Sequence, residues 1–225
     1  MKMPSSGIER KIAITTDFDG VISKVNVLNS LYQKFGRSDW QSYTKRWEMG
    51  EIGTKTEIYK CLGSATATRE EMELHLESIP LDMSIIDLYN YCQDRGYYFA
   101  IISDGFEWYI EYLLEKIGIF DLDIFANKIH FQGEEIFFSF PWYDPRTPLR
   151  GTSKVSIIEK IKEEFFRVLF LGDGHSDIEV LGVADSVLAK NFLLKYAKRM
   201  NISVTEFSDL GEALKLIKKD LREIR

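Results

Sequence analysis

The sequence predicts an α/β fold: a parallel sheet with helices on both faces, plus a small helical cap inserted after the first strand. Three observations predict this fold. Hydrophobic, strand-like runs alternate with helix-like segments along the chain. Three of these runs end in polar residues, namely Asp17, Ser103 and Asp173. Between the first and second runs lie 80 residues, far more than one crossover connection needs.

The first strand is expected at Ile12–Thr16, because apolar residues at consecutive positions indicate a strand buried on both faces. Asp17 and Asp19 follow it directly, at the carboxyl end where open α/β sheets bind their ligands. Gly20 then allows the chain to turn sharply. Taken alone, the segment fits a turn with two solvated acids equally well, so later segments must decide.

The long connection is expected to form four helices before the chain returns to the sheet. They cover residues 25–35, 38–49, 54–62 and 68–80. The fourth opens with a capping-box pattern, Thr68-Arg-Glu-Glu71, and carries Met72, Leu76 and Ile79 on one face before Pro80. We therefore predict a core domain of residues 1–24 and 81–225 and a cap domain of residues 25–80.

The rest of the core continues the alternation. A helix at 83–95, a strand at 97–103 and a helix at 106–117 are followed by paired strands in 123–140, with their turn at 132–135. Further strands are expected at 168–172 and 186–189. The last helix starts near Asp209 and carries an apolar stripe of Leu210, Leu214, Ile217, Leu221 and Ile224.

An aromatic cluster follows the paired strands. It comprises Phe137, Phe138, Phe140, Trp142 and Tyr143. Two interpretations stay open: a lip over the site, or packing against the core or a second subunit. The packing interpretation is the stronger of the two.

Composition restricts the class of protein. Hydrophobic residues make up 45% of the chain, which is enough for a substantial core. The net charge of −6 provides no global field to attract nucleic acid or anionic membranes. Cys61 and Cys92 form no CxxC pair, and the three histidines lack metal-ligand spacing. Residues 1–7 lack the apolar stretch of a signal peptide, and no apolar run approaches membrane-spanning length, so we expect a cytoplasmic protein.

A second acidic cluster reaches the same predicted edge. It is Gly172-Asp173-Gly174-His175-Ser176-Asp177, directly after a buried strand. Together with Asp17 and Asp19, Asp173 and Asp177 would repel one another unless a cation lay among them. Oxygen ligands in a site open to phosphate favour Mg²⁺. A glycine-rich turn with a helix-capping Asp177 is a fair alternative for one such loop, but a poor one for two loops at one edge.

Two further segments carry groups suited to an anion. Lys154 stands in the first turn of a predicted helix, where the helix dipole disfavours a cation, so an anion or the carboxylates would have to hold it there. A merely solvated lysine stays an alternative. Ser103, followed by Asp104 and Gly105, can donate to a phosphoryl oxygen, as can exposed main-chain N–H groups beside it.

These segments, in this order, resemble the four motifs of the haloacid dehalogenase (HAD) superfamily, whose core is a Rossmann-like sheet. The motifs are Asp17-Phe18-Asp19-Gly20, Ser103, Lys154 and Gly172–Asp177. The helical insertion is similar to the cap of the phosphoserine phosphatase-like branch. Within that branch the arrangement also resembles the methionine-salvage 2-hydroxy-3-keto-5-methylthiopentenyl-1-phosphate phosphatases.

The resemblance implies a role for each residue. Asp17 would be the nucleophile that forms an aspartyl-phosphate, and Asp19 would move the proton. Mg²⁺ would be held by Asp17, the main-chain carbonyl of Asp19 and Asp173, with Asp177 orienting that set. The phosphoryl group would be bound by Ser103, Asp104, Gly105 and Lys154. The implied activity is hydrolysis of a small phosphorylated metabolite.

The sequence departs from the family pattern at three positions. Val21 replaces a common threonine, Asp104 stands where glycine is usual, and Asn26 lies near the position of the acid that holds the amine in phosphoserine phosphatases. Phosphoserine is therefore disfavoured as the substrate. Asp19 argues against a dehalogenase, which needs no proton donor there. A phosphomutase and a catalytically silent phosphometabolite-binding module stay open, as does the oligomeric state.

Overall fold

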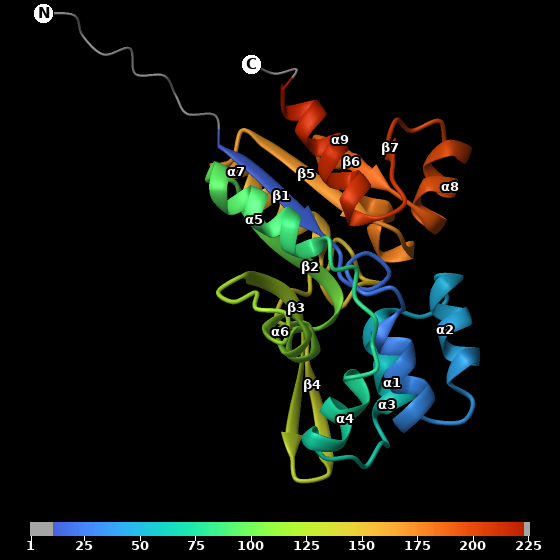
Figure 1. The fold of residues 1–225 in the computed structure, drawn as a ribbon. Coiled ribbons are helices and arrows are strands. Elements are labelled where there is room, and N and C mark those ends of the chain that lie inside the picture. Colours follow the sequence, from blue (N-terminus) through green and yellow to red (C-terminus); the bar gives the residue numbers. More distant parts are fainter. Residues whose placement is uncertain (1–10, 223–225) are drawn as a thin grey trace, which may run out of the picture.

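The computed structural model describes residues 11–222, which form a seven-stranded sheet in the order β4-β3-β2-β1-β5-β6-β7 (Figure 1). Only β4 runs antiparallel to its neighbour, so the sheet is mostly parallel. The strands are β1 (Ile12–Thr16), β2 (Tyr98–Phe106), β3 (Asp123–Gln132), β4 (Glu135–Ser139), β5 (Arg167–Gly172), β6 (Ser186–Ala189) and β7 (Thr205–Glu206). The predicted α/β class is confirmed.

Helices cover both faces of this sheet. They are α1 (Val27–Phe35), α2 (Trp40–Glu48), α3 (Thr54–Leu62), α4 (Arg69–Leu76), α5 (Ile85–Arg95), α6 (Glu107–Glu115), α7 (Lys154–Glu164), α8 (Asn191–Arg199) and α9 (Leu210–Arg222), with a 3₁₀ helix η1 (His175–Gly182). Ile14 packs in the cluster that contains α5 and α9, whereas its neighbour Ala13 packs with α7. Consecutive residues of β1 thus face opposite buried layers, which is why its apolar residues do not alternate with polar ones.

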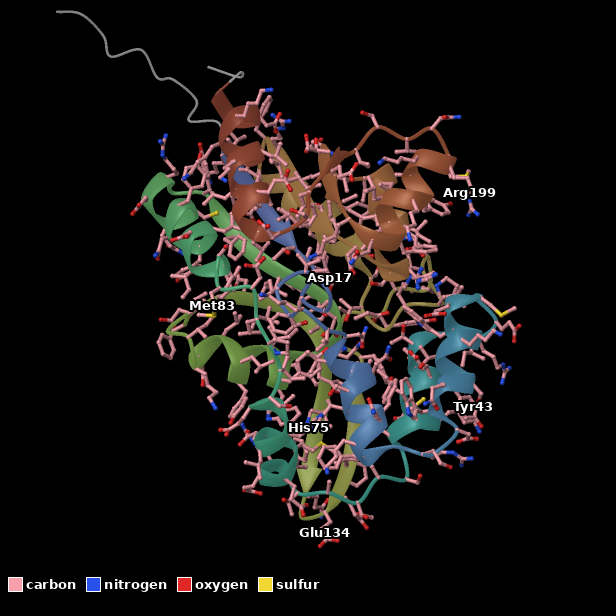
Figure 2. All side chains as sticks on the ribbon, turned by 45° about the vertical axis from the view of Figure 1, so that its right-hand side comes forward. Asp17, Tyr43, His75, Met83, Glu134 and Arg199 are labelled. Carbon is pink, nitrogen blue, oxygen red and sulfur yellow. The ribbon has the colours of Figure 1, made fainter. Side chains whose placement is uncertain are left out.

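Helices α1–α4 gather beyond the carboxyl ends of the strands, with the β3–β4 hairpin beside them (Figure 1); we refer to α1–α4 as the helical group. Thr68 and Glu71 form the predicted capping box of α4, but that helix ends at Leu76 and does not include Ile79. The chain enters and leaves the group through two paired segments, where Ser23 and Leu81 form an isolated bridge. Asp17 lies between the sheet and the helical group (Figure 2). The division into domains at 24 and 81 stays a prediction.

None of the five aromatic residues of the cluster lines the central cavity; Phe138, Phe140 and Trp142 are buried or half-buried, whereas Phe137 and Tyr143 are exposed. Phe138 stacks on Phe106 with ring centroids 5.5 Å apart, and Trp142 contacts Phe125 at 4.9 Å. Neither residue is among those that line the cavity described below. The lip interpretation is therefore wrong for the described part of the chain. The packing interpretation agrees with these contacts.

Several elements differ from the sequence expectation. β2 runs three residues beyond Ser103, η1 is a 3₁₀ helix, and β7 and α8 were not predicted. In the last helix, Leu210, Leu214, Ile217 and Leu221 are buried, as the apolar stripe predicts. Residues 1–7 and Ile224 lie outside the described residues. Across residues 11–222, every helix is too short or too polar to cross a membrane.

Candidate active site

A cavity of about 580 Å³ lies where the strand ends meet the helical group. The sheet side contributes Asp17, Asp19, Ser103, Asp104, Gly105 and Asp173. The helical group contributes residues that include Asn26, Thr44, Trp47, Glu48, Thr54 and Glu57. The acids that follow β1 and β5 therefore reach one site, together with the polar end of β2.

Asp17 is fixed at the end of the central strand. Its N–H donates to the carbonyl of Leu171 on β5 over 2.9 Å, which extends the ladder to this residue. Its Oδ1 accepts the N–H of Phe18 at 2.7 Å, and its Oδ2 lies 2.7 Å from the Lys154 ammonium. Burial raises the pKa of Asp17, and the Lys154 ammonium opposes that rise.

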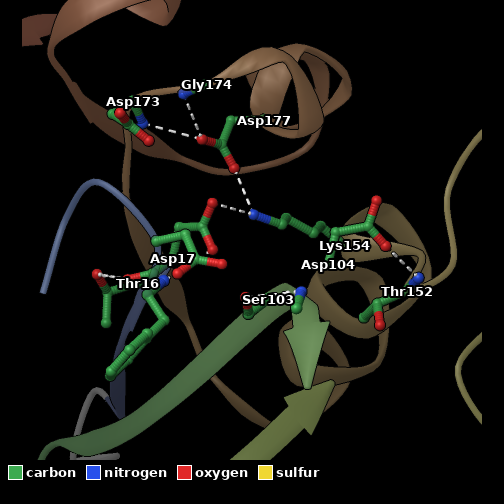
Figure 3. A network of polar contacts seen from close by, with 12 residues as sticks. Thr16, Asp17, Ser103, Asp104, Thr152, Lys154, Asp173, Gly174 and Asp177 are labelled. Atoms are coloured by element: carbon green, nitrogen blue, oxygen red, sulfur yellow. Dashed lines mark hydrogen bonds and ion pairs between the residues drawn. The ribbon is translucent and has the colours of Figure 1, made fainter. Parts of the chain in front are cut away.

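Lys154 is the first residue of α7, and it is only 2% exposed. Its Nζ contacts both Asp177 and Asp17 (Figure 3), at 2.6 Å from Asp177 Oδ1 and 2.7 Å from Asp17 Oδ2. Burial alone would lower the pKa of Lys154, but the two carboxylates outweigh burial and hold that pKa above its ordinary value. The cation that the helix dipole disfavours is thus held in place by two anions.

Asp177 shapes the loop that follows β5. Its Oδ2 accepts the N–H groups of Asp173 and Gly174, each at 2.9 Å. Asp173 Oδ2 in turn accepts a hydrogen bond from Asn191 Nδ2 at 3.0 Å. Gly20 has a φ of +75°, and a Cβ there would collide with the Asp173 carboxylate. The predicted glycine turn therefore also makes room for the second acidic loop.

Asp19 is held from both sides. Its Oδ1 accepts the N–H of Val27 at the start of α1 over 2.9 Å, and its Oδ2 accepts the hydroxyl of Tyr109 over 2.5 Å. Burial raises the pKa of Asp19 to about 6, against the hydrogen bond from Tyr109. Gly105 is equally constrained, because a Cβ there would overlap the Tyr109 hydroxyl.

The donor set at this site fits a hard divalent cation. Carboxylate oxygens of Asp17, Asp173 and Asp177 lie within 4.8 Å of one another. Burial, followed by the nearby charge of Asp177, raises the pKa of Asp173 to about 6. Such crowding of buried anions is what a cation with oxygen ligands would relieve. The Asp19 carboxylate is not in this group, which is consistent with the prediction that Asp19 would offer only its main-chain carbonyl.

Ser103 and Asp104, two of the residues predicted to bind phosphate, already accept hydrogen bonds from other groups of the protein. Gly105 N–H donates to Ser103 Oγ over 3.1 Å. The Asp104 carboxylate accepts hydrogen bonds from Thr54 and from the N–H groups of Gly151 and Thr152. The Asp104 carboxylate is therefore held by the loop before α7 and by α3, although Asp104 also lines the cavity.

Some residues of the site were missed from the sequence. Tyr109 lies in an apolar helix whose pattern does not separate a site tyrosine from a core one. Asn127 is a buried polar residue within β3. Lys190 and Asn191 directly follow β6, so the rule that polar residues after a buried strand line the site could have found both.

Glu57 is a buried acid on the cavity wall of the helical group. Burial is the main cause that raises its pKa from 4.5 to about 8, with a smaller contribution from Asp104. The folded protein therefore keeps a proton on Glu57 between pH 4.5 and 8 that the unfolded chain releases, so the folded state loses stability as pH rises through this range.

We expect Glu57→Gln to remove this loss, because glutamine carries no titrating proton. The melting temperature of Glu57→Gln minus that of the wild type should increase steadily from pH 4.5 to 8 and level off above. Thermal unfolding followed by circular dichroism across this range measures the difference. A difference that does not change with pH would contradict the buried, protonated state of Glu57.

A mostly parallel sheet whose strand ends bring carboxylates around one buried lysine defines a protein of the HAD class. The chain belongs to the family described as "Putative Phosphatase", whose model matches residues 12–196. It is a phosphoserine phosphatase-like member of the HAD superfamily, as its motifs predict, and it falls among the HAD-type phosphatases.

Among its relatives are two bacterial 2-hydroxy-3-keto-5-methylthiopentenyl-1-phosphate phosphatases. The Brevibacillus brevis protein is 21% identical over 96% of this chain and 100% of its own length, and the Lysinibacillus sphaericus protein is 28% identical over 93% and 95%. Human phosphoserine phosphatase is 26% identical over 78% and 80%.

Solved structures show the same fold. A substrate-bound phosphoserine phosphatase complex superposes with a TM-score of 0.70 at 21% identity, over 93% of this chain and 99% of that one. A phospho-aspartyl intermediate analogue of phosphoserine phosphatase also has a TM-score of 0.70, at 22% identity over 92% and 99%.

Proposed function

We propose that the protein is a Mg²⁺-dependent phosphatase that hydrolyses a small phosphate monoester through an aspartyl-phosphate on Asp17. One observation carries this proposal. The Asp17 carboxylate opens on a cavity while its Oδ2 pairs with buried Lys154, and Asp19 lines the same cavity. An anionic nucleophile, a cation for the phosphoryl charge and a proton carrier are the groups this reaction needs.

The reaction would take place in two steps. An oxygen of Asp17 attacks phosphorus, the ester P–O bond breaks, and Asp19 gives its proton to the leaving alkoxide. Water then attacks the phosphorus of the aspartyl-phosphate, Asp19 takes its proton, and inorganic phosphate leaves with Asp17 restored. Ser103 and Lys154 would bind the phosphoryl oxygens and offset their charge in the transition state.

Asp17, the main-chain carbonyl of Asp19 and Asp173 would hold Mg²⁺, and Asp177 would orient this set through its bonds to the loop of Asp173. When bound, Mg²⁺ would supply positive charge for the phosphoryl oxygens. We further propose that the helical group acts as the cap of residues 25–80 and selects the leaving group.

A cavity of about 580 Å³ is of the size that binds small metabolites. The side chain of Asn26 caps α1 by accepting the N–H of Asn29 at 2.7 Å, so its oxygen is already engaged. As a neutral amide, Asn26 also offers no charge to a substrate amine. The relatives are named for an enol phosphate and for phosphoserine, and a panel of phosphorylated metabolites should contain both.

We expect hydrolysis of p-nitrophenyl phosphate to fall at least about 100-fold when EDTA removes divalent metal, and to return with excess Mg²⁺. Asp173→Asn should raise the Mg²⁺ concentration needed for half-maximal rate, since it removes one carboxylate of the acidic group. Glu179→Gln is the matched control, because this acid of η1 pairs with Arg150 outside that group. Full activity without divalent metal would contradict the proposal.

Two alternatives are tested in the same assay. A phosphomutase would transfer the phosphoryl group to a second hydroxyl and would release little inorganic phosphate. A silent binding module would bind a phosphometabolite without turnover. Asp17 and Asp19 line one cavity and Asp17 pairs with Lys154, which argues against a silent module. A phosphomutase would use the same acids, so release of inorganic phosphate decides between the two enzymes. The cytoplasmic location stays a prediction, and the oligomeric state stays open.

A further inference from the structure

A bulge at the end of β2 separates the roles of Ser103 and Asp104. The ladder pairs Ile102 with Phe125 and then Phe106 with Asn127, so three residues of β2 face a single residue of β3. Bulges of this kind re-aim side chains beside active sites. Here Ser103 and Asp104 both line the cavity, and the Asp104 carboxylate also reaches the loop that leads to α7 (Figure 3).

One oxygen of Asp104 fixes that loop. Its Oδ1 accepts the N–H of Gly151 at 2.9 Å and the N–H of Thr152 at 2.8 Å. The main-chain carbonyl of Asp104 accepts Asn127 Nδ2 at 2.7 Å, and Asn127 Oδ1 accepts the Thr152 hydroxyl at 3.2 Å. A Cβ on Gly151 would lie 2.6 Å from Asn127 Oδ1, so the loop fits closely here. Thr152 is two residues before Lys154.

The other oxygen of Asp104 reaches the helical group. Its Oδ2 accepts the hydroxyl of Thr54, the first residue of α3. The same Thr54 oxygen accepts Trp47 Nε1 from α2 at 2.9 Å, and the Thr54 N–H donates to Leu149 O, also at 2.9 Å. Asp104 and Thr54 are both buried. One carboxylate therefore joins the helical group to the segment that delivers Lys154.

We propose that Asp104 is a positioning residue that couples the placement of the helical group over the cavity to the placement of Lys154 against Asp17. This inference rests on the proposed function. In this role the Asp104 carboxylate acts through the N–H groups of Gly151 and Thr152 and through Thr54. The oxygens of this buried anion accept hydrogen bonds from four donors: the Thr54 hydroxyl, the N–H groups of Gly151 and Thr152, and Asn127 Nδ2. The anion therefore keeps its geometry without pairing to Lys154.

The test uses full-length protein and p-nitrophenyl phosphate. Asp104→Ala should lower kcat about 100-fold with a smaller change in KM, because a displacement of Lys154 of about 1 Å has an effect of that order. Asp104→Asn should restore most of the rate, since its Oδ1 can accept both N–H groups and its Nδ2 can donate to Thr54. Asp144→Ala is the matched control, because Asp144 also binds α7, through Ser156, but away from the cavity. It should leave kcat unchanged.

A second set of variants tests the coupling between Thr54 and Asp104. Thr54→Val should lower kcat about 10-fold and shift the Trp47 emission, because the indole N–H loses its acceptor. Since Thr54 acts through Asp104, the double variant Asp104→Ala/Thr54→Val should be no slower than Asp104→Ala. Multiplying effects would overturn the coupling, and wild-type kcat in Asp104→Ala would overturn the positioning role.

Hydrogen exchange of residues 149–155 makes the test independent of turnover. It should speed up in Asp104→Ala and stay slow in Asp104→Asn and Asp144→Ala, and unchanged exchange in Asp104→Ala would overturn the inference. An inactive wild type would count against the proposed function, whereas an active wild type with normal Asp104→Ala would count against this inference alone. If Asp104→Ala does not fold, Thr54→Val decides: unchanged kcat and Trp47 emission would overturn the proposal.

Discussion

Asp17→Asn is expected to lower kcat on p-nitrophenyl phosphate by at least about 10⁴-fold. An amide is a poor nucleophile, and the aspartyl-phosphate cannot form on it. The change is nearly isosteric, and Lys154 keeps its second partner, Asp177, at 2.6 Å. The variant should therefore fold, which its melting temperature can check. Steady-state kinetics with Mg²⁺ present measures the loss.

The matched control for this change is Asp144→Asn, which alters an acid that binds Arg146 and Ser156 outside the cavity. It should retain the wild-type rate. Comparable turnover by Asp17→Asn and the wild type would mean that another group attacks phosphorus.

Lys154→Met should have the largest effect on stability. The side chain is 2% exposed, and its removal leaves the buried carboxylates of Asp17 and Asp177 without their shared cation. Breaking a buried ion pair in this way costs about 3–5 kcal/mol. The rate should fall as well, since a cation for the phosphoryl group is lost. Denaturant unfolding measures the stability change.

Lys162 on the same helix provides a control, because it forms an ion pair of the same length. Its ammonium lies 2.6 Å from Asp185, the same distance as that between Lys154 and Asp177, but its side chain is 36% exposed. An exposed pair contributes at most about 1 kcal/mol, so Lys162→Met should change little. Similar losses of stability in both variants would contradict the expectation that the buried ion pairs of Lys154 contribute more than the exposed pair of Lys162.

How much the sequence could predict differs between elements. β1 was predicted with its observed bounds, because a strand buried on both faces leaves a continuous apolar run. α3 was also predicted with its observed bounds, since Gly63 follows it directly. β2 was predicted too short, because Ser103, Asp104 and Gly105 resemble a loop. The bulge is stabilised by Asn127 from another strand, which local sequence does not reveal.

The residues of the site also differ in how far the sequence could predict them. Residues at strand ends, such as Asp17 and Asp173, could be placed near one another from the order of the strands alone. The sequence predicted that an anion or the carboxylates hold Lys154. It did not single out Asp17 and Asp177 as the pair, because both are distant from Lys154 in sequence and only tertiary packing brings them together. Glu57 did leave a signal: on α3 it stands at helical spacing from buried Thr54 and Cys61, where an apolar residue would be expected.

Trapping the covalent intermediate tests the central claim most directly. Protein mixed with p-nitrophenyl phosphate and Mg²⁺ is quenched with borohydride, which reduces an acyl phosphate to an alcohol and so converts the phosphorylated aspartate to homoserine. Peptide mass spectrometry should find homoserine at position 17 and unmodified aspartate at 19 and 173. Homoserine at another position, or none at 17 while phosphate is being released, would contradict catalysis through Asp17.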